Sequence, residues 1–172
     1  MSRYSLVAAV LRRERSMKMR LVLVLLFLAR GELSGQTARG DVVRIGMLGF
    51  EASESLTGSG AERMLRTVVR VTNRGRDTVQ LTIAGDCPVA LRVARQFGGA
   101  AVWDGVQHRG LCYGVERLVR LAPTRSAEFV QTDSLRRLSL GGGQRGPYFL
   151  AAVLRIGGGL LLVPAGHADL SQ

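Results

Sequence analysis

RMLRTVVRVTN, residues Arg63–Asn73, is the stretch that decides the fold we expect for this chain of 172 residues. Its side chains divide between two faces with a period of two, which is the pattern of a β-strand with one buried face. Leu65, Thr67, Val69 and Val71 share one face, and Arg66, Val68, Arg70 and Thr72 share the other. We therefore predict a half-buried strand that packs its first face against a core.

The residues after this strand predict a tight turn. Asn73–Asp77 reads NRGRD, in which asparagine tolerates left-handed backbone geometry and Gly75 has no Cβ that would clash there. The alternation then resumes over Thr78–Ile83. We predict an antiparallel hairpin between Val69–Asn73 and Thr78–Ile83, turning at Arg74–Asp77. If Gly75 has a positive φ, Gly75→Val is expected to destabilise the fold.

The rest of the chain after Gly40 consists of short runs separated by turn residues, as in an all-β domain. Strands are predicted at Asp41–Phe50, Cys87–Arg95, Ala101–Asp104, Val115–Leu121, Ser126–Thr132, Tyr148–Ile156 and Leu160–Val163, with a Gly/Ser-rich loop at Glu51–Ala61. Residues 148–156 also have a helix-favouring composition, but the Gly-Pro before them and the three glycines after them favour a strand. We expect an antiparallel β-sandwich of immunoglobulin type over residues 41–165, followed by a C-terminal tail over residues 166–172.

The N-terminal segment has the pattern of a secretion signal. Residues 21–29 read LVLVLLFLA, an uninterrupted apolar run that follows Lys18 and Arg20. The run is shorter than the about 20 apolar residues that a membrane-spanning helix needs. We expect a helical signal peptide over residues 1–35 and a linker over residues 36–40. The alternative is a buried helix in an intracellular protein.

This signal has two consequences for the rest of the interpretation. Because Met17 and Met19 directly precede the apolar run, residues 1–16 are interpreted as an extension of the gene model. The mature protein is expected to be secreted or periplasmic, without a stable membrane span after the signal is removed.

The charge distribution argues against a nucleic-acid partner. The formal net charge is +11, but seven of the basic residues precede Gln36. After Gly35 there are 17 arginines and 11 acidic residues, a net charge of +6. The arginines are spread along the chain, and no row of aromatic residues accompanies them for stacking on bases. We therefore expect a solvated surface and a protein partner.

Several short motifs together resemble the intracellular proteinase inhibitor family, which has a BsuPI-type domain. They are V-x-V-T-N-x-G-x-D-x-V-x-L at Val69–Leu81, L-R-V at Leu91–Val93, V-W-D at Val102–Asp104, L-x-P-x-x-S at Leu121–Ser126 and G-P-Y at Gly146–Tyr148. Where that family usually has glycine after the proline, this chain has Thr124. The resemblance covers roughly residues 65–155 and implies an immunoglobulin-like sandwich and, as an activity, inhibition of a proteinase.

The two cysteines, Cys87 and Cys112, are expected to form one disulfide bond. An even number of cysteines in an exported chain favours pairing, because disulfides persist in oxidising compartments. The alternative is two buried free cysteines that behave as small apolar side chains.

A candidate binding loop comprises Trp103, Asp104, His108 and Arg109. Trp103 is interpreted either as an exposed anchor for a partner or, preferably, as a core residue near the disulfide. Gly141–Gly146 matches the glycine pattern of a dinucleotide-binding loop, but Pro147 and a β-like run follow it where a helix is needed. We expect no catalytic residues, metal site or cofactor.

Two functional hypotheses remain after these exclusions. The first is a non-catalytic binding module of the bacterial cell envelope that acts on another protein, with proteinase inhibition as its specific form. The second is a structural or accessory domain of an envelope assembly, which an exposed apolar strand edge would favour.

Overall fold

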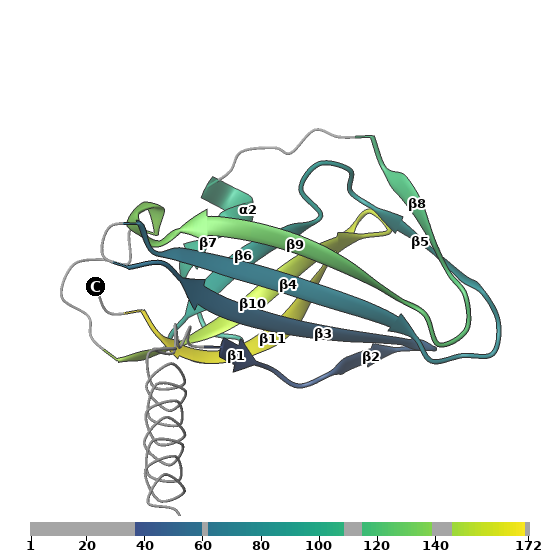
Figure 1. Ribbon diagram of the computed structural model, residues 1–172, viewed down its shortest axis with the longest axis horizontal. Helices are drawn as coiled ribbons and strands as arrows, with labels where there is room; N and C mark the ends of the chain where they lie inside the picture. Colours follow the sequence, from purple (N-terminus) through teal and green to yellow (C-terminus); the bar gives the residue numbers. More distant parts are fainter. Residues whose placement is uncertain (1–36, 60–61, 109–114, 139–145, 171–172) are drawn as a thin grey trace, which may run out of the picture. The chain divides into compact units, whose positions relative to one another are not determined.

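A computed structural model describes residues 37–59, 62–108, 115–138 and 146–170, all within the compact unit Gly35–Gln172. The described residues form two antiparallel sheets (Figure 1). Sheet A contains β1 (Thr37–Arg39), β2 (Val43–Ile45), β3 (Leu48–Thr57), β4 (Met64–Asn73) and β9 (Ser126–Ser134). Sheet B contains β5 (Val79–Ile83), β6 (Val89–Ala94), β7 (Ala101–Asp104), β8 (Arg117–Leu121), β10 (Pro147–Ile156) and β11 (Gly159–Asp169). The all-β sandwich expected from the sequence is thus present.

Two short helical segments complete the described structure. The helix α2 (Gly105–His108) follows β7, and the 3-10 helix η2 (Leu135–Arg137) follows β9. Leu135 and the next apolar residue, Leu138, are buried, so η2 is anchored to the core directly after β9 ends.

Sheet A is built around β4, whose predicted alternation is confirmed. Its strand order is β1-β3-β4-β9, and β2 pairs with β3. Leu65, Thr67, Val69 and Val71 are buried, as the period-two pattern requires. They face sheet B, where the buried side chains of Ile83, Leu91, Leu150 and Leu154 supply the other half of the core.

The predicted hairpin is wrong, because β4 and β5 belong to different sheets. β4 pairs with β3 and β9, whereas β5 pairs with β8 and β10. Residues 74–77 therefore carry the chain across from sheet A to sheet B. Gly75 does not have a positive φ; a Cβ there would instead meet the side chain of Met47.

The buried side chain of Asn73 explains this corner. Its Nδ2 donates to the carbonyl oxygens of Asp77 at 2.7 Å and of Leu121 at 2.9 Å. Its Oδ1 accepts a hydrogen bond from the Gly75 N–H at 2.8 Å. Asn73 thus stabilises a turn, as expected. The turn carries the chain from one sheet to the other and does not form a hairpin.

The predicted loop at Glu51–Ala61 is also wrong over most of its length. β3 runs to Thr57, and the predicted strand Asp41–Phe50 is interrupted at Gly46 and Met47. Serine and glutamate dominate this segment, but Ala52, Glu54 and Leu56 alternate inward and are buried. Composition indicated a loop where the period of two indicated a strand.

Sheet B has β10 at its centre and extends further along the chain than expected. β10, confirmed as a strand, pairs with β11 on one side and with β6 and the end of β5 on the other. β11 continues to Asp169, within the expected tail, and Leu170 is buried. At the other end of the domain, β1 lies within residues 36–40, which we expected to be a linker.

β1 and β11 approach each other closely enough to close one side of the sandwich. Gly166 has φ 96°, and a Cβ on it would lie 2.9 Å from the carbonyl oxygen of Arg39. A Cβ on Gly40 would likewise meet the backbone of Pro164. Figure 1 shows β11 alongside β1 at this side. Glycine is required here because the two backbones leave no room for a side chain.

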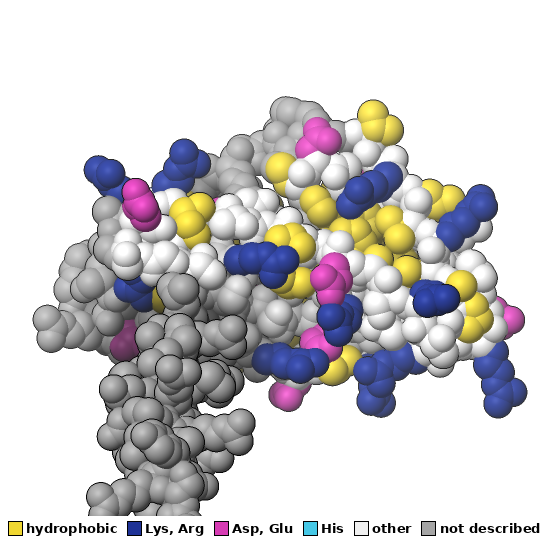
Figure 2. Space-filling model, in the orientation of Figure 1, with side chains coloured by type: hydrophobic (Ala, Val, Ile, Leu, Met, Phe, Trp, Pro, Cys, Tyr) yellow, Lys and Arg dark blue, Asp and Glu magenta, His cyan; other side chains and the backbone are white. Residues whose placement is uncertain are grey.

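The outer face of sheet A carries a ladder of alternating charges. Arg39 pairs with Glu51, and Arg70 donates to Glu128 from Nε at 3.0 Å and from a terminal nitrogen at 2.6 Å. Because Glu51 lies directly opposite Arg70 in the register, the four side chains follow one another across β1, β3, β4 and β9. Figure 2 shows acidic and basic side chains alternating down the middle of this face.

Candidate functional site

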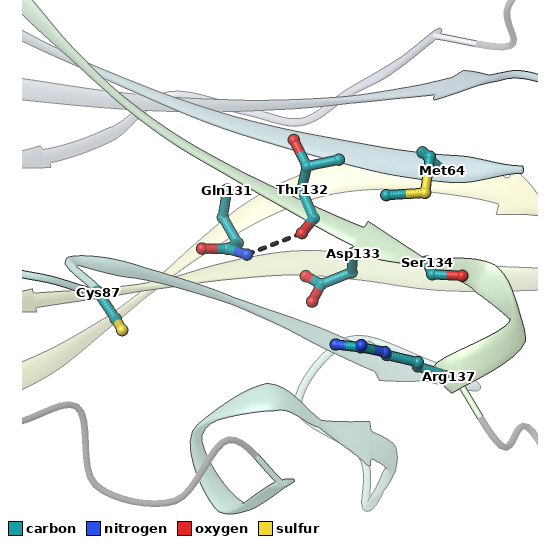
Figure 3. A pocket seen from close by; sticks show the side chains of 7 residues that line it. All are labelled: Met64, Cys87, Gln131, Thr132, Asp133, Ser134 and Arg137. Atoms are coloured by element: carbon teal, nitrogen blue, oxygen red, sulfur yellow. Dashed lines mark hydrogen bonds between the residues drawn. The ribbon is translucent and has the colours of Figure 1, made fainter. Parts of the chain in front are cut away.

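A hollow of about 590 Å³ lies at the end of β9. It is lined by Met64, Cys87, Gln131, Thr132, Asp133, Ser134 and Arg137 (Figure 3). These residues come from the beginning of β4, the end of β9, η2 and the segment between β5 and β6. The hollow therefore brings together one acid, one base, an amide and hydroxyl groups, which can bind a polar side chain or a peptide backbone.

The alternation of β9 places two of these polar side chains. Gln131 and Asp133 follow the buried Phe129 at a spacing of two, so they lie on the inner face of sheet A. In Figure 3 their side chains lie on the side of β9 that faces Cys87 and Arg137. Gln131 donates from Nε2 to the carbonyl oxygen of Thr132 at 2.8 Å, which orients its amide.

The start of η2 places Arg137 beside the hollow. The N–H of Leu135 donates to the carbonyl oxygen of Arg63 at 3.0 Å, and the N–H of Leu138 donates to the carbonyl oxygen of Leu135 at 3.0 Å. With Leu135 and Leu138 buried, the exposed Arg137 between them extends along the wall of the hollow.

A buried polar row leads from the hollow into the sandwich. Glu54, Thr67 and Gln131 are directly opposite one another in the register of β3, β4 and β9. Only 1% of Glu54 is exposed, and its Oε2 accepts a hydrogen bond from Thr67 Oγ1 at 2.7 Å. Its other oxygen, Oε1, has no hydrogen-bond partner among the residues described.

Burial governs the charge of this carboxyl group. It raises the pKa of Glu54 from 4.5 to about 8, against the lowering effect of the Thr67 hydrogen bond, and the nearby charge of Asp133 raises the pKa further. Glu54 is therefore mainly protonated at pH 7. The interior behind the hollow is polar but uncharged.

The candidate binding loop of the sequence analysis is not a loop where it is described. Trp103 and Asp104 lie in β7, and Trp103 is half-buried against the core, as the preferred interpretation holds. Asp104 Oδ1 accepts a hydrogen bond from the Val106 N–H at 2.9 Å and so caps α2. His108 ends α2, and Arg109 lies outside the described residues. Asp104 thus has a structural role.

The disulfide stays a prediction. Cys87 lines the hollow and is half-buried, and Cys112 lies outside the described residues. Most of the glycine-rich stretch Gly141–Gly146 lies outside them as well.

Sequence reasoning missed Glu54, Gln131, Asp133 and Arg137 as residues of interest. A signal for Gln131 was present, because it shares the parity of the apolar Phe129 in the predicted strand Ser126–Thr132, and Asp133 continues that parity one residue beyond the predicted end. Polar residues on the buried face of a strand indicate an opening or a partner in the core. Arg137 carries no such signal, since its position depends on how η2 is anchored.

The outer faces of β8 and β9 each expose an apolar side chain. Leu118 of β8 is 53% exposed and Val130 of β9 is 43% exposed. Figure 2 shows hydrophobic side chains gathered between these two strands. The guanidinium of Arg117 lies 5.7 Å from the ring centroid of Phe129, so the two strands are in contact.

Two other kinds of feature are absent from the described ranges. No group of three or more His, Cys, Asp or Glu residues there is placed to hold a metal ion. None of the helices there has the length and apolar character to cross a membrane. Comparison of the chain with models of known protein families and with curated proteins found no match.

Proposed function

We propose that this chain is an exported, non-catalytic binding module of the bacterial cell envelope whose ligand is another protein. The observation that carries the proposal is the hollow at the end of β9, where Asp133, Arg137 and Gln131 line an open polar space beside exposed apolar side chains. Mixed polar and apolar surface of this kind suits a polypeptide better than a small apolar molecule. The apolar run at residues 21–29 supports export.

The fold proposed for this module is the immunoglobulin type. The neighbours β3-β4-β9 correspond to strands A-B-E of such a sandwich, and β6-β10-β11 correspond to strands C-F-G. The crossing of the chain between sheets after β4 fits this order. Proteinase inhibition, the activity implied by the family resemblance, is the specific form of binding to be assayed first.

Photo-cross-linking in the cells that produce the protein tests the proposal. A benzophenone amino acid replaces Arg137 beside the hollow or, as a control, the exposed Arg44 on β2. We expect one covalent protein adduct from position 137 in the envelope fraction and none from position 44. Equal adducts from both positions, no adduct from position 137, or a chain confined to the cytoplasm would contradict the proposal.

An accessory role in an envelope assembly is the second candidate, and β8 favours it. Leu118 is exposed on this edge strand, and Val115 just before it is 91% exposed. An apolar strand edge is suited to permanent association with a neighbouring subunit. Co-purification of the adduct partner in fixed proportion after washing in high salt would indicate this role.

A further inference from the structure

We infer that β9 is a docking edge that accepts an extended segment of another protein as an additional strand of sheet A, and that this segment alternates apolar and acidic residues. The inference rests on the proposed function, because it names the place and the chemistry of the protein that the module binds. It is carried by the strand pairing, the exposed side chains and the charges around β9.

The backbone of β9 offers the first argument. β9 has nine residues, and within the described part of the chain only β4 pairs with it. An edge strand presents N–H and C=O groups that a second chain can bind, and such pairing is a common way to recognise extended peptides.

The other edges of the sandwich are closed, short or carry an inward-pointing charged side chain. β1 and β11 close on each other through Gly40 and Gly166, and β7 has only four residues. On β8, Arg117 lies opposite the buried Ile83 and therefore points inward, which hinders the docking of a further strand. β9 has neither proline nor lysine and exposes Val130 at its centre. It is thus the long edge without these protections.

The space beside β9 can receive side chains of a docked segment. Apolar side chains gather between β9 and β8 along the first part of the strand, and the hollow with Gln131 and Asp133 lies at its end. A segment added to the edge would place its alternate side chains on the two faces of sheet A, so that every second one lies over this space.

The charges around this edge select an acidic partner. Arg117 and Arg120 on β8 and Arg136 and Arg137 in η2 lie on elements that flank β9. Only two acids, Glu128 and Asp133, lie on the strand itself, and Glu128 is paired with Arg70. The excess of positive charge attracts acidic residues and disfavours basic ones.

Binding of defined peptides to the purified exported protein tests the inference. The probes are a fluorescent nonapeptide of alternating valine and glutamate, its valine–lysine counterpart, and a peptide with the first composition in block order. We expect the alternating acidic peptide to bind at least about tenfold more tightly than the other two. We also expect it to slow amide exchange within Ser126–Ser134.

Matched variants locate the binding edge. Val130→Glu on β9 should weaken binding of the acidic peptide about tenfold or more, because it places like charges side by side. Ile45→Glu, on the exposed edge strand β2 of the same sheet, should leave it unchanged. Circular dichroism and the melting temperature of both variants establish that each is folded.

Three results would overturn the inference. They are equal loss of binding in both variants, no preference for the alternating acidic peptide, and a dimer in analytical ultracentrifugation that Val130→Glu dissociates, since a second copy would then occupy the edge. A partner that still cross-links at position 137 while Val130→Glu has no effect would overturn the docking edge and leave the proposed function standing. Loss of every specific cross-link would remove the proposed function itself.

Discussion

The two sides of the sandwich differ in whether the edge strands of the two sheets close against each other. On one side β1 and β11 touch through glycines, and the neighbouring strand β3 holds Glu54 almost completely buried. On the other side β8 and β9 expose Leu118 and Val130, and a hollow opens beside the half-buried Asp133. The same inner face of sheet A thus carries one buried acid and another at an opening.

This difference separates stability from recognition. Backbone contact without side chains, as at Gly166, leaves no space for a ligand and makes substitution costly. Exposed apolar groups and polar side chains at an opening add little to stability but are available to a partner. We therefore expect substitutions on the closed side to change unfolding and those on the open side to change binding.

Glu54 gives the largest expected effect. Because its pKa in the folded protein is raised from 4.5 to about 8, the folded state binds the extra proton and stability falls as the pH rises between these values. Urea unfolding should show a loss of about 3 kcal/mol between pH 5 and pH 8. Glu54→Gln should abolish most of this slope, whereas Asp133→Asn, which removes only the smallest of the listed effects on the pKa of Glu54, should keep most of it. A wild-type slope that persists in Glu54→Gln would assign the effect to another group.

Gly166 tests the closure directly. Gly166→Ala should destabilise the fold by about 3 kcal/mol, because it combines a left-handed backbone with a collision against the backbone of Arg39. Gly158 also has a positive φ but has open space around it, so Gly158→Ala should cost only about 1 kcal/mol. Equal melting temperatures for the two variants would show that β1 and β11 do not touch in solution.

The predicted disulfide bond between Cys87 and Cys112 would add a covalent cross-link at Cys87, which lines the hollow on the open side. It closes a loop of about 25 residues, for which the chain-entropy model gives about 3 kcal/mol, a value that engineered bonds often do not reach. We expect no titratable thiol in the denatured, unreduced exported protein, and a lower urea midpoint after reduction. Two thiols per chain would disprove the bond and remove one argument for export.

Thr124 gives the smallest effect and the opposite sign. It has φ 62° in the turn between β8 and β9, where the Arg125 N–H donates to the carbonyl oxygen of Ala122 at 3.1 Å. This left-handed position of the turn favours glycine and is unfavourable for a β-branched residue. Thr124→Gly should raise the free energy of unfolding by about 1 kcal/mol without altering peptide binding. A lower melting temperature would show that the Thr124 hydroxyl, which donates to the Pro123 carbonyl oxygen, matters more than the backbone strain.

The strands that sequence could predict are those in which apolar residues mark the period. β4 satisfies this condition, and β10 was predicted instead from the Gly-Pro before it and the three glycines after it. The alternation of β3 was missed because glutamate and serine dominate its sequence. Which strands pair could not be predicted from the local sequence, because the NRGRD turn has the same chemistry in a hairpin as in a crossing between sheets. What decides between them is the contact of Asn73 with Leu121, 48 residues away.

The candidate site was predictable only in part for a similar reason. The parity of Gln131 could be read from the predicted strand Ser126–Thr132, and Asp133 continues it one residue beyond the predicted end. Their convergence with Cys87 and Arg137 depends on η2 and on the segment before β6, which come together only in the folded chain. Glu54 could not be recognised as buried while its segment was interpreted as a loop.

The hydrogen bonds of Asn73 also delay the folding of a newly made chain, because their partners are synthesised later. Its backbone accepts a hydrogen bond from the Thr124 N–H at 3.0 Å and donates one to the Arg125 carbonyl oxygen at 2.9 Å, besides the side-chain bond to Leu121. At synthesis rates of about 5–20 residues per second, these partners arrive several seconds after Asn73 itself. Until then the corner between the sheets lacks half of its hydrogen bonds, and the first strands cannot close around a core. Under the proposed export, such a delay would keep the chain unfolded while it passes through a membrane channel.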